Sequence, residues 1–191
     1  RRKILTYKGK KDFSELKLNY APVRESVKLN YARVINSDKV QEISEQEKNI
    51  MDASWVAGAP KYDPTKILVC SLPGVEIGSI IEYEYEMDCT GTWPCQSSFI
   101  FQDYAHVVHR KLTINVPEKL SLYAKYHPGG WLVKTKGFEN LVKATTETKY
   151  GIKTLTWEAN DIPILAREND LPSFTMFTPS VVIGFGDWKQ H

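Results

Sequence analysis

Residues 68–87 read LVCSLPGVEIGSIIEYEYEM, and the second half of this stretch decides the fold. From Ile81 to Met87, large apolar residues alternate with acidic ones. Successive side chains of a β-strand point to opposite faces, whereas a helix would scatter the glutamates around its circumference. The alternation therefore predicts a half-buried strand. The side chains expected to face the core are Ile81, Tyr83, Tyr85 and Met87, and those expected to face water are Glu82, Glu84 and Glu86.

Short alternating runs of the same kind recur along the chain, separated by turns that contain Gly, Pro or Asn. One of them spans residues 23–35, where Val27, Leu29, Tyr31, Arg33 and Ile35 are expected to share a face. This spacing is typical of a sandwich or barrel rather than of βαβ units. We therefore expect an all-β fold, a two-layer antiparallel β-sandwich with one short helix and long loops. The other expected strands lie at 2–7, 16–20, 40–43, 67–72, 97–101, 106–116, 120–126, 131–134, 141–146, 153–159 and 181–185.

The best helix candidate is the segment from Ser44 to Trp55. Ser44 is followed three residues later by Glu47, which is the capping-box spacing, and the apolar residues Ile50 and Met51 come next. Residues 8–12 are expected to form a turn after the first strand. Residues 161–179 contain three prolines and little periodicity, so we expect a long ordered loop there.

Size and composition indicate one large all-β domain, with two small domains as the alternative, and we expect the chain to be a segment of a longer protein. The 191 residues carry a net charge of +2, with 42% hydrophobic and 25% charged residues. This balance gives no basic footprint of the kind that binds nucleic acid or membranes. No apolar run approaches the roughly 18 residues needed to span a bilayer, and no signal-peptide pattern is present. We expect a single domain over residues 1–186, with residues 187–191 beginning a linker to a downstream domain.

The three cysteines indicate structural rather than catalytic roles. Cys70 sits in an apolar run and is expected to be a buried, inert thiol. Cys89 and Cys95 flank a short loop and could form a disulfide in an oxidising compartment, but spacing alone does not settle this pairing. We expect no metal site and no cofactor, because no Cys or His pair has ligand spacing; His106 and His109 fall on opposite faces of a strand.

Enzymatic chemistry has little support in the residues. Cys95 with His106 or His109, oriented by Asp103, could in principle form a nucleophile and base. No strand-to-helix elbow of the kind that presents a nucleophile accompanies Cys95, so we expect no catalytic residues in this chain.

Tryptophans give the most interesting binding candidates. Trp55, Trp93 and Trp131 lie in or beside expected loops, where an indole ring can stack on a sugar or anchor a partner chain. They can equally plug the ends of a sandwich. Trp157 alternates with Leu155 and Ala159 and is expected in the core.

Several segments together resemble one bacterial family, the domain of unknown function DUF3857. The most specific is Ser71-Leu72-Pro73-Gly74-Val75 with the Glu-Tyr strand at 81–85. The likeness departs from the family at residues 36–39, where an Asp-Gly turn is common, and at Ala105, where Pro is frequent; both positions are turns. The further matching segments are 31–35, 59–63, 101–102, 112–117, 156–159, 161–163 and 187–188.

The resemblance implies a function that the residues alone do not supply. Members of this family are β-sandwich domains that precede a transglutaminase-like, papain-type catalytic domain in periplasmic or secreted proteins, often of Bacteroidetes. The resemblance therefore implies that this chain is a non-catalytic module that positions such a catalytic domain. That domain would be its partner in the same polypeptide. The alternative is a carbohydrate- or peptide-binding module that uses the loop tryptophans Trp55, Trp93 and Trp131.

Overall fold

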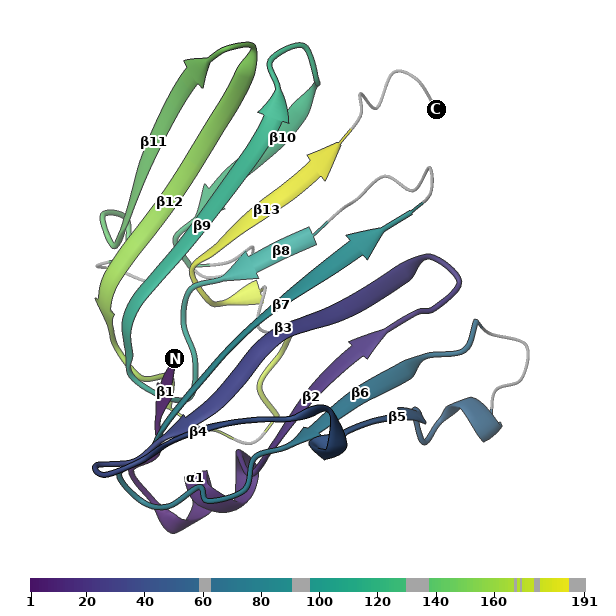
Figure 1. The fold of residues 1–191 in the computed structure, drawn as a ribbon. Coiled ribbons are helices and arrows are strands. Elements are labelled where there is room, and N and C mark those ends of the chain that lie inside the picture. Colours follow the sequence, from purple (N-terminus) through teal and green to yellow (C-terminus); the bar gives the residue numbers. More distant parts are fainter. Residues whose placement is uncertain are drawn as a thin grey trace. The chain divides into compact units, whose positions relative to one another are not determined.

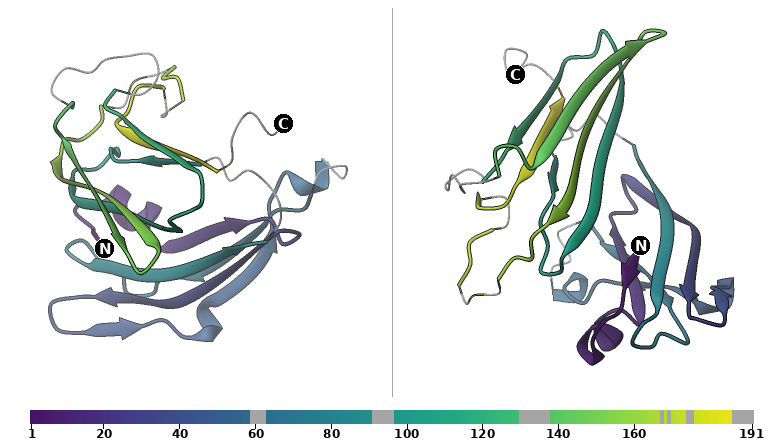
Figure 2. Two further views of the ribbon diagram at one scale, coloured as in Figure 1. Left: turned by 90° about the horizontal axis from the view of Figure 1, so that it is seen from above. Right: turned by 90° about the vertical axis from the view of Figure 1, so that its left-hand side faces the viewer.

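The computed structural model describes residues 1–58, 63–90, 97–129, 138–166, 168, 170–173 and 176–185. The chain divides into two compact units, Arg1–Thr92 and Trp93–His191. Each unit consists of antiparallel strands around a buried core of its own (Figures 1 and 2). The expectation of one domain over residues 1–186 stays a prediction, and the expected linker at 187–191 lies outside the described residues.

Unit 1 contains a four-stranded sheet in the order β1-β7-β3-β4 and a three-stranded sheet in the order β2-β6-β5. All pairings are antiparallel. The elements of this unit are β1 (Arg2–Lys3), α1 (Tyr7–Asp12), β2 (Glu15–Tyr20), β3 (Glu25–Ile35), β4 (Val40–Glu42), η1 (Glu45–Glu47), β5 (Lys48–Asp52), η2 (Val56–Gly58), β6 (Lys66–Ser71) and β7 (Ile80–Cys89), the two η elements being 3-10 helices.

The two sheets of unit 1 share one core. Leu16 and Leu18 of β2 and Cys70 of β6 pack in the same cluster as Val34 of β3 and Ile81 of β7. Cys70 is fully buried, which confirms the prediction of a buried thiol, and burial raises the pKa of that thiol. The alternating residues of β2, β3 and β6 therefore supply both inner faces of a small sandwich.

Unit 2 is built in the same way from two three-stranded sheets, ordered β10-β13-β8 and β11-β12-β9. Phe101, Trp157, Ile162 and Val181 lie at the centre of its core, so the expectation that Trp157 is a core residue is confirmed. None of the sheets formed by the described residues closes into a barrel. The strands of this unit are β8 (Ser97–Ile100), β9 (Val107–Pro117), β10 (Leu122–His127), β11 (Val142–Lys149), β12 (Ile152–Ile162) and β13 (Ser180–Phe185).

These two units confirm the prediction of an all-β fold with antiparallel sheets, but the one α-helix formed by the described residues lies elsewhere than expected. The helix is α1, where a turn was predicted. The side chain of Thr6 accepts a hydrogen bond from the Gly9 backbone N–H at 3.0 Å and caps the helix. Lys10 and Lys11 in the last turn complement the helix dipole. The first strand consequently ends at Lys3 instead of Tyr7.

The prediction of a helix over 44–55 is wrong beyond its first turn. The capping box exists, because Ser44 and Glu47 exchange the expected hydrogen bonds, but it starts only the three-residue helix η1. From Lys48 the chain pairs with β6 as strand β5. Pairing with a neighbouring strand therefore overrides the local helix signal, as tertiary context often does.

A β-bulge in β3 changes which of its side chains are buried. The register with β7 shifts between Leu29 and Tyr31. Leu29 faces the core as predicted, but beyond the bulge Ala32 and Val34 are buried in place of Tyr31 and Arg33. An extra residue in one strand of a pair reverses the alternation after it. The prediction of one shared face from Val27 to Ile35 is therefore wrong past Leu29.

The prediction that residues 81–87 form a strand is confirmed by β7. The prediction that all four of its large apolar side chains are buried is wrong. Ile81 is 3% exposed and belongs to the core, but Tyr83, Tyr85 and Met87 are 39%, 43% and 40% exposed. Alternation fixes the direction of a side chain and not what covers it. The core of unit 1 ends at Ile81 along this strand.

Candidate functional site

The exposed half of β7 carries a row of large apolar side chains on one face. The Tyr83 and Tyr85 rings have centroids 6.4 Å apart and lie 23° from parallel, and Met87 continues the row. The β3 residues opposite them are Ala32, Leu29 and Val27. We call Tyr83, Tyr85 and Met87 the β7 aromatic row. Exposed apolar side chains that adjoin one another in this way are typical of contact surfaces.

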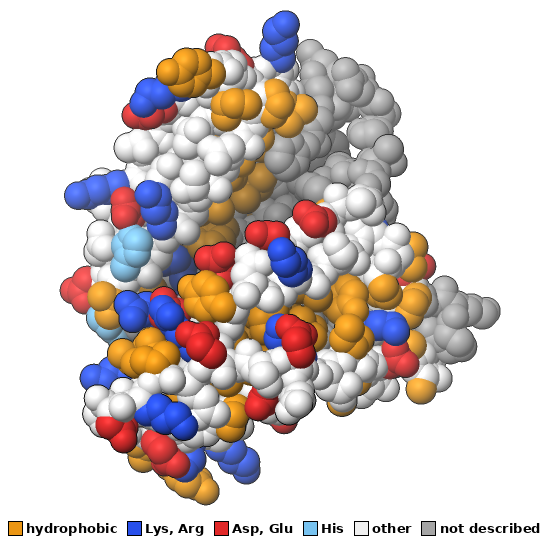
Figure 3. Space-filling view, viewed as in Figure 1, with side chains coloured by type: hydrophobic (Ala, Val, Ile, Leu, Met, Phe, Trp, Pro, Cys, Tyr) orange, Lys and Arg blue, Asp and Glu red, His pale blue; other side chains and the backbone are white. Residues whose placement is uncertain are grey.

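The opposite face of β7 is organised around Arg33. Its guanidinium lies 2.9 Å from Glu82 and 3.5 Å from Glu42, and Arg1 reaches Glu82 at 3.6 Å. The hydrogen bond from Arg33 holds the pKa of Glu82 below its ordinary value, and the same contact raises the pKa of Arg33. On the face seen in Figure 3, acidic and basic side chains lie interspersed with hydrophobic ones.

The other two glutamates of β7 are held by the bulge residue, Asn30. The Asn30 side-chain amide donates to Glu84 and to Glu86, each at 3.0 Å. Lys28 of β3 stands opposite Glu86, but no ion pair within 4.0 Å joins a described Lys or Arg to either glutamate, in contrast to Glu82. The bulge thus explains why an Asn stands here: it places a two-hydrogen donor between successive outward glutamates.

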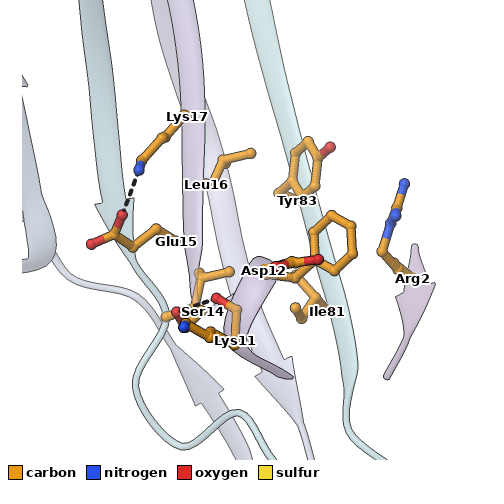
Figure 4. Close-up of a pocket in the computed structure, with 11 residues that line it drawn as sticks. Arg2, Lys11, Asp12, Ser14, Glu15, Leu16, Lys17, Ile81 and Tyr83 are labelled. Carbon is orange, nitrogen blue, oxygen red and sulfur yellow. Dashed lines mark hydrogen bonds and ion pairs between the residues drawn. The ribbon is translucent and has the colours of Figure 1, made fainter. Parts of the chain in front are cut away.

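A cavity of about 500 Å³ lies in unit 1 beside the start of the aromatic row (Figure 4). Phe13, Leu16, Ile81 and Tyr83 give it apolar surface, and the Arg2 guanidinium lies 4.0 Å from the centroid of the Phe13 ring. Five of the eleven lining residues are apolar and six are polar, so the lining is mixed, whereas ligand pockets are mainly apolar. Its polar lining consists of Arg2, Lys11, Asp12, Ser14, Glu15 and Lys17, of which Glu15 and Lys17 form an ion pair at 2.9 Å.

Among the sequence-predicted binding residues, only Trp55 is described. It lies between β5 and η2 and is 46% exposed. Trp93 and Trp131 lie outside the described residues. Cys89 is exposed at the end of β7 and bonds to no described cysteine. Its expected partner Cys95 lies outside the described residues, so the disulfide stays a prediction.

Unit 2 pairs its two candidate histidines with carboxylates on β12. His109 Nε2 lies 2.7 Å from Glu158, and His106 Nε2 lies 2.7 Å from Asp161. The hydrogen bond to His109 lowers the pKa of Glu158. Asp103, the expected orienting carboxylate, lies 3.8 Å from Arg110 instead. In the described part of the chain, no group of three His, Cys, Asp or Glu side chains could hold a metal ion.

Sequence reasoning missed the cavity and the exposure of the aromatic row. The cavity depends on α1, which brings Phe13 beside β7, and the signal that could have found it is Thr6 as an N-cap residue with Lys10 and Lys11 in the last turn. The exposure of Tyr83 and Tyr85 has no local signal. It depends on how far the second sheet of unit 1 extends.

Residues 1–166 match the model of a family described as a domain of unknown function with a solved structure. The chain belongs to the DUF3857 family. The resemblance predicted from the Leu-Pro-Gly-Val segment and the strand after it is therefore confirmed. No curated protein matches the sequence.

A crystal structure from Parabacteroides distasonis shares the fold of this DUF3857 chain, with a TM-score of 0.79 and 22% sequence identity. That protein is named a putative protease. The match covers 94% of this chain and 34% of the Parabacteroides chain. This chain therefore spans about a third of the length of that protein. No described helix of this chain is long and apolar enough to cross a membrane.

Proposed function

We propose that this DUF3857 chain is a non-catalytic interaction module that precedes and positions a transglutaminase-like, papain-type catalytic domain. The observation that carries the proposal is the coverage of the structural match. Nearly all of this chain corresponds to about a third of a longer protein that is named a putative protease. In this proposal the chemistry belongs to the rest of such a protein, and the parent is periplasmic or secreted.

The surface of unit 1 supports a contact role. The β7 aromatic row, Tyr83, Tyr85 and Met87, is about 40% exposed at each position. Fully burying an apolar side chain is worth about 1.5–3 kcal/mol, and about 60% of each of these side chains is covered already, so a partner that covered the rest would gain roughly 0.6–1.2 kcal/mol at each position. Aromatic residues are also enriched at interaction hot spots.

Turnover by the isolated chain tests the proposal. The purified 191-residue chain is incubated with a peptide library and with glutamine-containing amine acceptors, beside the full-length parent protein. We expect turnover from the parent and none from the chain. Turnover by the chain alone, lost on Cys95→Ala or His109→Ala, would overturn the proposal.

A second candidate is a carbohydrate- or peptide-binding module. Trp55 favours it, because its indole is 46% exposed in the described structure. Ligand binding would quench tryptophan fluorescence, and the quenching would be reduced in Trp55→Ala. A glycan and peptide array without a hit at millimolar concentration would argue against this candidate.

A further inference from the structure

Among the described strands of unit 1, the outer edge of β7 is paired over only a small part of its length. On one side β7 pairs with β3 from Ile80 to Cys89. On the other side β1 pairs with Ile80 and Ile81 alone. Within unit 1, no described strand pairs with residues 82–89 on that side. A bare strand edge presents backbone N–H and C=O groups that can accept one more strand.

The side chains along this edge determine which residue types an added strand would need. On one face it would meet the aromatic row, Tyr83, Tyr85 and Met87. On the other face it would meet Glu84 and Glu86, which accept from Asn30; Lys28 of β3 stands opposite Glu86, but no ion pair within 4.0 Å joins a described Lys or Arg to either glutamate. Cross-strand pairs are favourable when opposite charges or apolar groups face each other. The fitting strand therefore alternates apolar residues with Lys or Arg.

The first cross-strand pairs at this edge, between β1 and β7, are present in the structure. β1 runs antiparallel to β7 with Arg2 opposite Ile81, which brings Arg1 beside Glu82, and the two side chains are 3.6 Å apart. A strand that leads into Arg1 in the same register would place its next residue opposite Tyr83 and the one before that opposite Glu84. Basic residues at every second position would then repeat the contact between Arg1 and Glu82.

We propose that the outer edge of β7 from Tyr83 to Cys89 is the docking edge for a strand of the parent polypeptide that leads into β1, with apolar residues alternating with Lys or Arg. The proposal rests on the proposed function, in which this chain is one module of a longer protein. A second copy is disfavoured as the occupant. Antiparallel pairing of two β7 edges with their aromatic rows on one face places glutamates opposite glutamates, and like charges directly opposite are destabilising.

Hydrogen exchange at β7 tests the proposal. The five-residue extension Val-Lys-Val-Lys-Val is fused in front of Arg1 as a probe in the predicted register, with Val-Glu-Val-Glu-Val as the matched control. We expect the β7 amides that do not bond to β3 to exchange at least about tenfold more slowly with the Lys extension than in the 191-residue chain. The Glu extension should protect them much less. The full-length parent protein should protect the same amides.

Charge variants show whether the protection depends on the glutamates of this edge or on surface charge in general. Glu84→Gln together with Glu86→Gln should remove most of the difference between the Lys and Glu extensions, whereas Glu147→Gln, on exposed strand β11 of unit 2, should leave it unchanged. Equal protection by both extensions would overturn the proposal, and so would β7 amides that exchange as fast in the full-length parent as in the chain alone. Either result would leave the turnover test of the proposed function unaffected.

Discussion

Asn30 shows at the scale of a single residue where two-residue alternation stops being a guide. Around it the polar residues fall at Lys28 and Asn30 and then at Arg33, so the local mark of the bulge is a single spacing of three in place of two. The extra residue nevertheless turns Arg33 outward toward Glu82 and turns Val34 into the core. The buried Cys70 and Trp157 were predictable, because each lies in a run whose register the structure keeps. The orientations of the β3 side chains beyond the bulge were not predicted.

The contact between Arg33 and Glu82 predicts a pH dependence of stability. The pKa of Glu82 is lowered in the folded chain, so the contact stabilises the fold above the unfolded pKa and is lost as the pH falls through the folded value. We expect Glu82→Gln to lower the melting temperature at neutral pH, with a difference from the wild type that shrinks below about pH 4.

Thermal melts of both proteins between about pH 3 and pH 7 measure this difference. Glu147→Gln is the control, because Glu147 forms an exposed ion pair with Lys149 and such pairs contribute little. A gap between wild type and Glu82→Gln that stays constant over the whole range would contradict the prediction.

At the scale of elements, strands were predictable and helices were not. Strands are indicated in a sequence by the alternation of apolar and polar residues, and most of the expected strands are present. A six-residue helix such as α1 is too short for a 3.6-residue period to show, and isolated helices of that length are marginal. The capping box at Ser44 was correctly recognised, but the element that follows is decided by the pairing of β5 with β6.

The cap of α1 gives a prediction at this scale. Thr6→Ala removes the side-chain oxygen that accepts from the Gly9 N–H, so we expect a loss of about 1 kcal/mol in the free energy of unfolding. Because α1 brings Phe13 to the cavity, the loss should be accompanied by faster exchange of the amides of residues 9–13. Urea titration and hydrogen exchange measure the two effects. Thr6→Ser, which keeps the hydroxyl, should restore most of the stability, and an equal loss in both variants would contradict the role of the cap.

At the scale of the whole molecule, the sequence predicted the fold class and the family, and it left two small domains as the alternative to one large domain. Residues 88–96, rich in Gly, Thr, Pro and Cys, coincide with the boundary between the two units, but a composition of this kind marks any loop. The division follows from which strands pair and from the separate cores, and neither is a local property. The candidate site was predictable only in part, because the strand of the aromatic row was evident and its exposure was not.

The claim that this chain serves a neighbouring catalytic domain is tested most directly by complementation. The parent protein is prepared without this chain, and its kcat/KM on a peptide substrate is measured before and after the 191-residue chain is added in trans. The account predicts a fall of at least about tenfold on removal and recovery on addition, with weaker recovery by a chain carrying Tyr83→Ser and Tyr85→Ser. A parent protein whose kcat/KM is the same with and without this chain would contradict the account.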